Sequence, residues 1–174
     1  PRQDAQGALN PRSIGSPVVT HDRHDEQLSV DPATLAAIVK AYDIRGVVPD
    51  QLDAGLCRAV GNAFVQVLAA EGAVPGVVVG YDMRPSSPAL AEAFAAGAAA
   101  AGVDVTVIGL ASTDELYCAS GLLGLPGAMF TASHNPAQYN GIKMCRSGAA
   151  PVGQESGLAQ LARMHAAIQV EDDR

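Results

Sequence analysis

The sequence predicts a layered α/β fold built on a largely parallel β-sheet. Short runs of β-branched apolar residues alternate with longer segments whose apolar residues recur at helical spacing, the pattern of successive βαβ units. The short runs are apolar throughout, as expected of strands covered on both faces. Aromatic residues make up only 4% of the 174 residues, so alanine, glycine and valine supply most of the packing surface between the layers.

The first 30 residues differ from the rest because they show no apolar periodicity. We expect residues 1–30 to form a mobile tail and residues 31–170 to form one domain. Four side chains of the tail are of types that bind metals: His21, Asp22, His24 and Asp25. A solvated polar tail is the favoured interpretation, since no rigid element would hold these ligands in place.

The domain is expected to begin with a short helix. Asp31 serves as its cap and Pro32 occupies its first turn, and the helix ends near Lys40. Residues 41–48 predict a strand or bend, and residues 51–71 carry a long helical stripe of apolar residues.

The rest of the domain alternates strands with helices. The expected strands lie at residues 76–80, 103–108, 128–132 and 141–145. The expected helices lie at residues 87–101, 112–123 and 152–170. Ser87 and Pro88 open the first of these helices and Gly102 ends it, whereas Ser112 or Thr113 caps the second. In such sheets ligands bind beyond the carboxyl ends of the strands, which is where the polar clusters of this sequence fall.

Charge and composition argue against several classes of function. A net charge of -7 disfavours a nucleic-acid surface or an anionic membrane as partner. The sequence shows neither a bilayer-spanning segment nor a signal peptide. The three cysteines (Cys57, Cys118 and Cys145) lie far apart, which predicts reduced thiols in the cytosol rather than a disulfide framework.

The most informative segment is Thr-Ala-Ser-His-Asn-Pro at residues 131–136. It follows an apolar strand, so Ser133 should be exposed at a strand end, and the chain then returns a cation, Lys143. A hydrolase serine is improbable because Ser133 lacks the flanking glycines of a nucleophile elbow. His134 should point away from Ser133, as neighbours on an extended chain do. The alternative is that these residues merely form a polar turn.

Several motifs in one order resemble the α-D-phosphohexomutase superfamily. Besides the segment at 131–136, these are Lys-Ala-Tyr-Asp-Ile-Arg-Gly at 40–46, Val-Gly-Tyr-Asp-Met-Arg-Pro-Ser-Ser at 79–87, Gly-Leu-Ala-Ser-Thr at 109–113 and Tyr-Asn-Gly-Ile-Lys at 139–143. The similarity covers about residues 38–170 and is to the first domain of phosphomannomutase/phosphoglucomutase enzymes. It implies a three-layer α/β/α sandwich with a mostly parallel, mixed sheet.

The resemblance also implies an isomerase that works by intramolecular phosphoryl transfer. A phosphorylated Ser133 would donate its phosphoryl group to a hexose phosphate, with hexose 1,6-bisphosphate as the activator, and would regain a phosphoryl group from the other position. Lys143 matches a lysine that assists proton transfer, and His134 matches the neighbour of the phosphoserine. Tyr42, Arg45 and Asn135 are expected to contact substrate or phosphate. Magnesium would be bound in part by the phosphate on Ser133.

Three groups of charged residues have simpler interpretations. Arg45 can form an ion pair with Asp43, and this remains an alternative to its phosphate-binding role. Asp82 and Arg84 could contact a ligand, but a salt bridge within the domain is the favoured interpretation. Acidic residues at the start of the helix at 112–123 are expected to cap it.

Other working parts of the family have no counterpart in this sequence. There is no Asp-Gly-Asp metal loop, and the sugar-recognition and second phosphate-binding loops are also missing. We therefore expect residues 171–174 to begin an interdomain linker of a longer cytoplasmic mutase, and the isolated chain not to turn over. A non-catalytic sugar-phosphate-binding module from a truncated gene is the alternative. Tyr-Asp-Ile-Arg-Gly favours the mannose/glucose branch without separating the two sugars.

Overall fold

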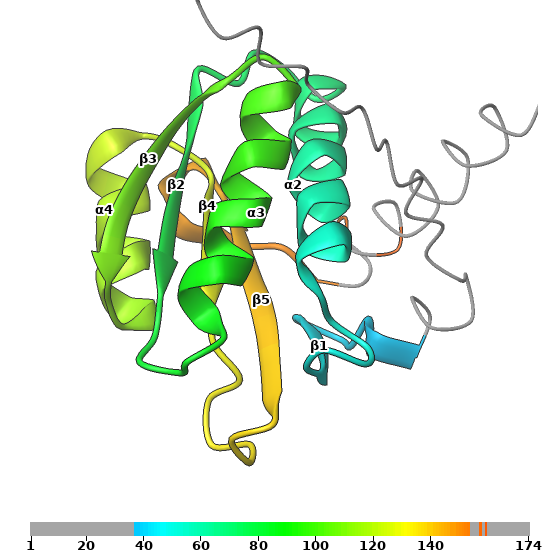
Figure 1. Ribbon diagram of the computed structural model, residues 1–174. Helices are drawn as coiled ribbons and strands as arrows, with labels where there is room; N and C mark the ends of the chain where they lie inside the picture. The colour runs from blue at the N-terminus through cyan, green and yellow to red at the C-terminus, as the bar shows by residue number, and fades with distance from the viewer. Residues whose placement is uncertain (1–36, 154–156, 158, 160–174) are drawn as a thin grey trace, which may run out of the picture.

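The structure is a computed structural model that describes residues 37–153, 157 and 159. Its strands are β1 (Ile44–Val47), β2 (Gly76–Tyr81), β3 (Asp104–Leu110), β4 (Gly127–Phe130), β5 (Tyr139–Arg146) and β6 (Ala150–Pro151). Its helices are α2 (Ala54–Ala69), α3 (Ser87–Ala100), α4 (Thr113–Leu123) and the 3-10 turn η1 (Ser147–Ala149). The strands form one sheet in the order β1-β5-β4-β2-β3, with β6 paired to β5 (Figure 1).

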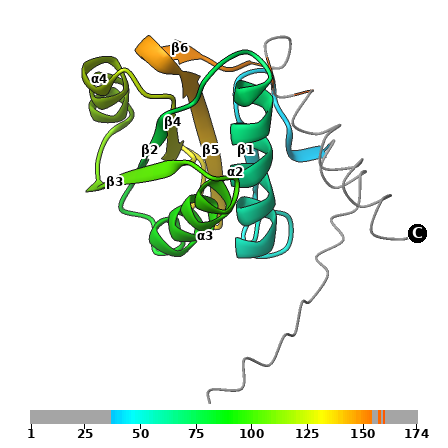
Figure 2. The ribbon, with the colours of Figure 1, turned by 90° about the horizontal axis from the view of Figure 1, so that it is seen from above.

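The sheet lies between two helical layers, which confirms the predicted three-layer sandwich. Helices α2 and α3 cover one face and α4 covers the other (Figure 2). The buried strand β2 contacts the helical layers on both faces of the sheet. Val77 and Val79 belong to the larger core under α2 and α3, whereas Val78 packs with Leu116 of α4. Successive side chains of a strand point to opposite faces, so an uninterrupted apolar run is what this position requires.

The sheet is mixed, and its parallel part comprises β2, β3 and β4. Strand β5 runs antiparallel to β4, β1 and β6. The reason is local, because β4 and β5 are joined by a short loop, and a short loop can only return the chain antiparallel. The strand order also places β1 beside β5, although the two strands are far apart in the sequence.

Helices α2 and α3 make direct backbone contact. A Cβ atom added at Gly97 would lie 1.9 Å from the carbonyl oxygen of Arg58, and one added at Gly61 would lie 2.1 Å from that of Phe94. In the core, the centre of the Phe94 ring lies 6.0 Å from that of Phe64 and 5.6 Å from that of Phe130. Glycines in the helices thus bring them close enough for a few large side chains to fill the core.

Element ends differ from expectation in a few places. The predicted strand at 128–132 ends at Phe130. Val152 does not begin a helix, because its N–H bonds to the Met144 carbonyl and continues the β6 pairing. The expected short helix at 31–40 is described only from Ala37, where two helical residues precede a bridge at Val39.

The tail at 1–30 and most of the helix at 152–170 lie outside the described residues. No helix in the described part of the chain is long and apolar enough to cross a membrane.

Candidate active site

Ser133 lies in the loop between β4 and β5, at the end of the molecule toward which the arrows of β2 and β3 point (Figure 1). Its side chain is exposed, and its backbone has φ = 55°, in the left-handed region. A non-glycine residue there costs about 1 kcal/mol or more and needs support from its surroundings. Part of that support is a hydrogen bond of 3.0 Å from the Ser133 amide to Thr131 Oγ1.

His134 lies beside the Ser133 hydroxyl, contrary to expectation. Its Nε2 is 3.3 Å from Ser133 Oγ. The expectation assumed an extended chain, and it is wrong because the positive φ of Ser133 turns the two side chains to one side. His134 can therefore exchange a hydrogen bond with the hydroxyl.

Two small turns shape the rest of the loop. Asn135 donates to the Ala132 carbonyl from its backbone N–H at 3.0 Å and from its side-chain amide at 2.8 Å. The Tyr139 amide donates to the Pro136 carbonyl at 3.0 Å. The Asn135 side chain thus bonds to the loop itself, and its expected contact with phosphate stays a prediction.

Arg84 packs against the inner side of this loop and donates four hydrogen bonds to backbone carbonyls there. Its Nη1 donates to the carbonyls of Pro136 and Tyr139, both at 2.9 Å. Its Nη2 donates to the carbonyls of Ser133 at 2.9 Å and Asn135 at 2.8 Å. The side chain is only 12% exposed, and its Nε faces Asp82 Oδ2 at 3.3 Å. The expected salt bridge with Asp82 is confirmed, but the four contacts with the loop were not predicted.

A buried polar network joins the β2–α3 connection to β5. Ser87 Oγ donates to Asp82 Oδ1 at 2.6 Å, and the Asn140 amide donates to Ser86 Oγ at 2.8 Å and Ser87 Oγ at 2.9 Å. Ser87 and Asn140 are both fully buried. Because every one of these groups has a partner, the network fixes the segment carrying Arg84 relative to the strand that follows the Ser133 loop.

The two predicted cations, Arg45 and Lys143, meet at one carboxylate. Asp43 is buried and forms an ion pair with Arg45, while Lys143 Nζ lies 3.6 Å from the same oxygen of Asp43. The pairing of β1 with β5 produces this arrangement, because Ile44 lies opposite Ile142. The alternative interpretation of Arg45 as an ion-pair partner is thereby confirmed.

Neither Arg45 nor Lys143 forms a hydrogen bond or ion pair with the Ser133 hydroxyl in the described residues. The Arg45 Nε is buried and has no hydrogen-bond partner there. Two cations on a single carboxylate leave one positive charge uncompensated. Their expected roles toward phosphate therefore stay predictions, and the excess charge is the observation in their favour.

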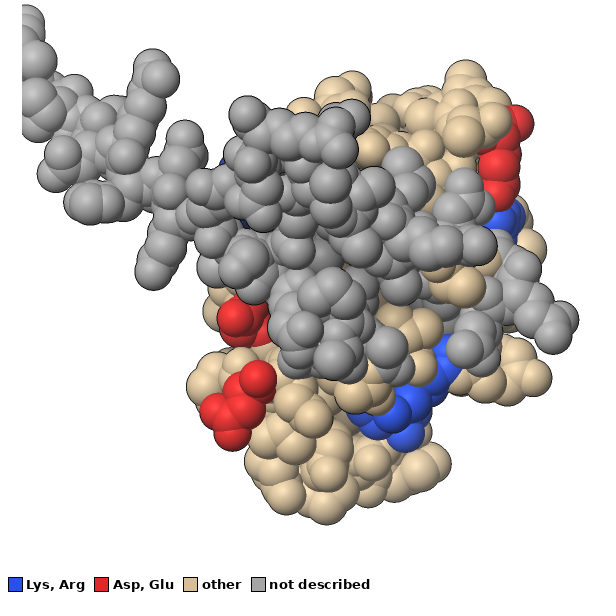
Figure 3. Space-filling view, turned by 90° about the vertical axis from the view of Figure 1, so that its right-hand side faces the viewer, with Lys and Arg blue, Asp and Glu red and all other residues tan. Residues whose placement is uncertain are grey.

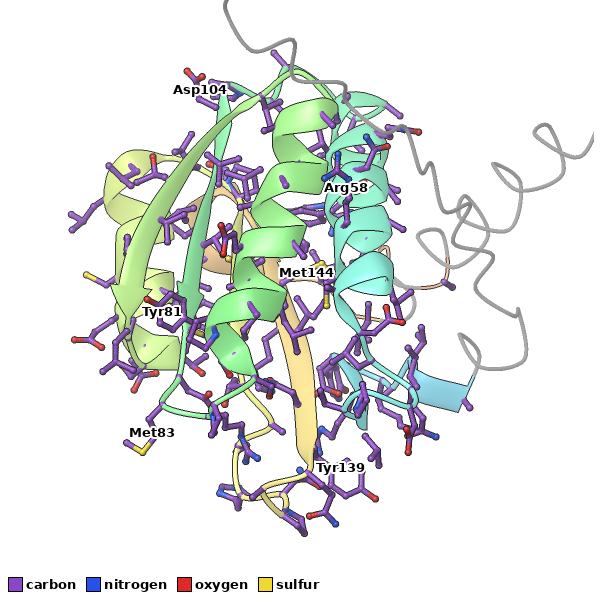
Figure 4. The ribbon with its side chains drawn as sticks, in the orientation of Figure 1. Arg58, Tyr81, Met83, Asp104, Tyr139 and Met144 are labelled. Atoms are coloured by element: carbon purple, nitrogen blue, oxygen red, sulfur yellow. The ribbon has the colours of Figure 1, made fainter. Side chains whose placement is uncertain are left out.

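Two large side chains in the motif segments are exposed, and one of them, Met83, lies at the end of the molecule that carries the Ser133 loop. Tyr42 is 75% exposed in the bend before β1, and Met83, next to Arg84, is 87% exposed. Figure 4 places Met83 and Tyr139 at this end and Asp104 at the opposite one. On the face shown in Figure 3, the largest group of basic atoms also lies toward the end that carries the loop.

The described residues contain no group of three or more His, Cys, Asp or Glu side chains able to hold a metal ion. They do not supply a magnesium site without further ligands. The phosphate expected on Ser133 would be one ligand, and the others would have to come from outside the described residues.

Comparison with known proteins identifies the family. Residues 36–169 match the family described as phosphoglucomutase/phosphomannomutase, alpha/beta/alpha domain I. The chain belongs to this family. The first-domain fold and the resemblance read from the sequence motifs are both confirmed.

Individual relatives agree with the family. The chain is 48% identical over 120 residues to a protein named "Phosphohexose mutases" from Xanthomonas campestris pv. campestris, an alignment that covers 68% of this chain and 26% of the relative. It is 42% identical over 127 residues to a phosphomannomutase from Klebsiella pneumoniae, covering 72% of this chain and 78% of the relative.

A solved phosphoglucomutase/phosphomannomutase family protein from Burkholderia thailandensis superposes with a TM-score of 0.68 at 36% identity, over 81% of this chain and 31% of that one. The chain thus spans about a quarter to a third of the length of the Xanthomonas and Burkholderia proteins.

Proposed function

We propose that this chain is the phosphoserine-bearing domain of a phosphohexomutase, and that Ser133 carries the phosphoryl group. The observation that carries the proposal is the exposed Ser133 hydroxyl on a loop at the carboxyl ends of the strands, held in a strained conformation by hydrogen bonds. An ordinary polar turn does not need a half-buried arginine bonded to three carbonyls of the loop and to that of the first residue of β5. The family membership and the names of the relatives support the same reaction.

The reaction moves a phosphoryl group between positions 6 and 1 of a hexose phosphate, with mannose or glucose as the sugar. A sugar hydroxyl attacks the phosphorus of phosphorylated Ser133, so that a new P–O bond forms and the bond to Ser133 Oγ breaks. The sugar hydroxyl gives up its proton, and Ser133 Oγ takes one up. After the bisphosphate turns over, the reverse transfer from its other phosphate restores the phosphoserine.

His134 and Lys143 have the chemistry for the two proton movements. His134 Nε2 is 3.3 Å from Ser133 Oγ, so it is the group positioned to hold the proton of the leaving or attacking hydroxyl. Lys143 is assigned to the sugar hydroxyl by its place in the Tyr-Asn-Gly-Ile-Lys motif. Tyr42 and Asn135 are assigned to the substrate by their places in the segments at 40–46 and 131–136. Tyr42 is exposed and Asn135 is partly exposed, which is compatible with that role.

Positive charge near the loop suits an anionic ligand. A phosphoserine carries about −1.5 to −2 charges at neutral pH, and each charge-assisted contact contributes about 1.5–3 kcal/mol. Arg45 and Lys143 share a single carboxylate, so their combined charge is not cancelled within the cluster. Magnesium would add further positive charge when bound, through ligands supplied with the rest of a longer protein.

Phosphate uptake by the chain tests the assignment of Ser133. The chain is incubated with Mg2+ and either glucose 1,6-bisphosphate or mannose 1,6-bisphosphate, and its intact mass is measured. We expect a gain of one phosphate that is absent from Ser133→Ala and retained in Ser147→Ala, which removes an exposed serine outside the loop. Phosphate on Ser133→Ala, or none on any form, contradicts the proposal.

Turnover requires the parts that this chain does not contain. A chimera in which residues 36–169 replace the matching part of the Xanthomonas campestris relative should interconvert hexose 1-phosphate and hexose 6-phosphate. The isolated chain should not. A folded chimera without activity would favour the non-catalytic binding module instead.

A further inference from the structure

We propose that Arg84 is a positioning residue for phosphoryl transfer, because its guanidinium fixes the backbone conformation of the Ser133 loop through hydrogen bonds to backbone carbonyls. This inference rests on the proposed function for its chemical meaning. We call the four hydrogen bonds from the Arg84 guanidinium to backbone carbonyls the clamp. The clamp is a property of the fold, so it can be tested without any phosphoryl donor.

The geometry accounts for every hydrogen-bond donor of the guanidinium. A guanidinium has five N–H donors in a fixed plane. Four of them bond to the carbonyls of Ser133, Asn135, Pro136 and Tyr139 at 2.8–2.9 Å, and the fifth faces Asp82. These carbonyls belong to both turns of the loop and to the first residue of β5. One rigid group therefore ties both turns of the loop to the start of β5.

The carbonyl of Ser133 matters most, because it belongs to the strained residue. Rotation of the peptide plane between Ser133 and His134 would break the bond to Arg84. This peptide is trans, so its N–H points away from the guanidinium that holds its C=O. The His134 N–H has no hydrogen-bond partner among the described residues, which leaves it free to donate to a phosphate on Ser133.

Arg84 is itself held in place before any ligand binds. Its own backbone N–H donates to Asp82 Oδ1 at 3.0 Å, and Ser87 donates to the same oxygen at 2.6 Å. Asn140 connects Ser87 to the start of β5, next to Tyr139. A clamp supported in this way lowers the cost of ordering the loop during reaction, since the loop is ordered in advance.

The charge and the planar shape of Arg84 both contribute. A lysine at this position keeps the charge but offers three donors from a single point and cannot span four carbonyls. A methionine keeps much of the length and removes both charge and donors. Arg58 provides the matched control, because it is exposed on α2 and Figure 4 shows it away from the loop.

Amide hydrogen exchange of the 174-residue chain tests the clamp, with Arg84→Lys, Arg84→Met and Arg58→Met compared with the wild type. The reporters are the amides of Asn135 and Tyr139, which close the two turns, and Val78 in the core of the sheet reports on the fold as a whole. We expect Arg84→Met to speed exchange of both loop amides at least about tenfold, Arg84→Lys to be intermediate, and Val78 and all amides of Arg58→Met to change less than about twofold.

A second measurement connects the clamp to chemistry. We expect the rate of phosphate uptake from the hexose bisphosphate to fall at least about tenfold in Arg84→Met at saturating donor, with the half-saturating concentration little changed. Low millimolar guanidinium chloride should restore part of that rate in Arg84→Ala, whereas sodium chloride should not. A merely structural role would give no such rescue.

Each outcome decides between the two claims. If the loop amides of Arg84→Met exchange as in the wild type, or if Val78 accelerates equally, the clamp is refuted. If uptake by Arg84→Met is unchanged while the wild type takes up phosphate, the positioning role of Arg84 in phosphoryl transfer is refuted. If the wild type takes up no phosphate while the exchange pattern is as expected, the proposed function fails and the loop-fixing role of Arg84 stands.

Discussion

Replacing Gly97 by alanine should push helices α2 and α3 apart. The added Cβ would lie 1.9 Å from the carbonyl oxygen of Arg58 and 2.8 Å from its carbonyl carbon. Contacts of this kind normally lie beyond 3.4 Å. The opposing atoms are backbone, so no side-chain rotation can relieve the overlap, and one helix has to move as a unit.

The magnitude follows from two opposing effects. Overpacking a well-packed interface typically costs about 1–3 kcal/mol, and a clash between helix backbones belongs at the upper end or above it. Alanine in place of glycine inside a helix gains about 1 kcal/mol. We therefore expect Gly97→Ala to lose about 2 kcal/mol or more of the free energy of unfolding.

Gly121→Ala is the matched control, because the same substitution in α4 meets nothing within 4 Å. Only the gain in helix propensity remains there, so this variant should be more stable than the wild type by about 0.5–1 kcal/mol. Urea unfolding followed by circular dichroism measures both. If Gly97→Ala is as stable as the wild type with an unchanged denaturant slope, the close approach of the two helices is refuted.

Two further predictions concern the start of α4 and the thiols. Ser112→Ala should destabilise the chain by about 1 kcal/mol in urea unfolding, because Ser112 Oγ accepts from the Glu115 amide and Glu115 bonds back to the Ser112 amide. The hydrogen bonds with Ser112 lower the pKa of Glu115, so the carboxylate's contribution to the free energy of unfolding is present at neutral pH and is lost as the pH falls through that lowered pKa. Glu115→Gln should remove this loss of stability in acid. If stability falls in acid as it does in the wild type, the capping box is contradicted. In the folded chain, a disulfide reagent should modify Cys118 alone, because Cys118 is exposed. Cys57 and Cys145 are buried, and burial raises the pKa of both thiols, so little reactive thiolate forms. Rapid reaction of all three cysteines would contradict the described core.

The sequence was sufficient to predict the layers because periodicity records burial directly. The run Gly-Val-Val-Val-Gly at 76–80 is buried on both faces, as its composition requires. The cap at Ser112 or Thr113 and the helix opening at Ser87 were predicted from local hydrogen-bond and dihedral preferences, and both agree with the structure within one residue. The exposure of Ser133 followed from a polar residue at the end of an apolar strand.

Non-local pairing was not predictable in the same way. That Asp43 holds both Arg45 and Lys143 depends on β1 lying beside β5, which no local pattern of either segment specifies. The orientation of His134 was predicted wrongly, because a positive φ at a serine is imposed by its surroundings and not by its own preference.

The chain's residues by themselves determined the alternation of strands and helices, the family and the position of the serine, because each depends on side chains near one another in sequence. Only the tertiary structure decided which cation supports that serine. Arg84 and Ser133 are 49 positions apart in the sequence, and the chain between them folds into a helix, a strand and a second helix before β4 returns beside β2. The guanidinium therefore reaches the loop only once the sheet has formed.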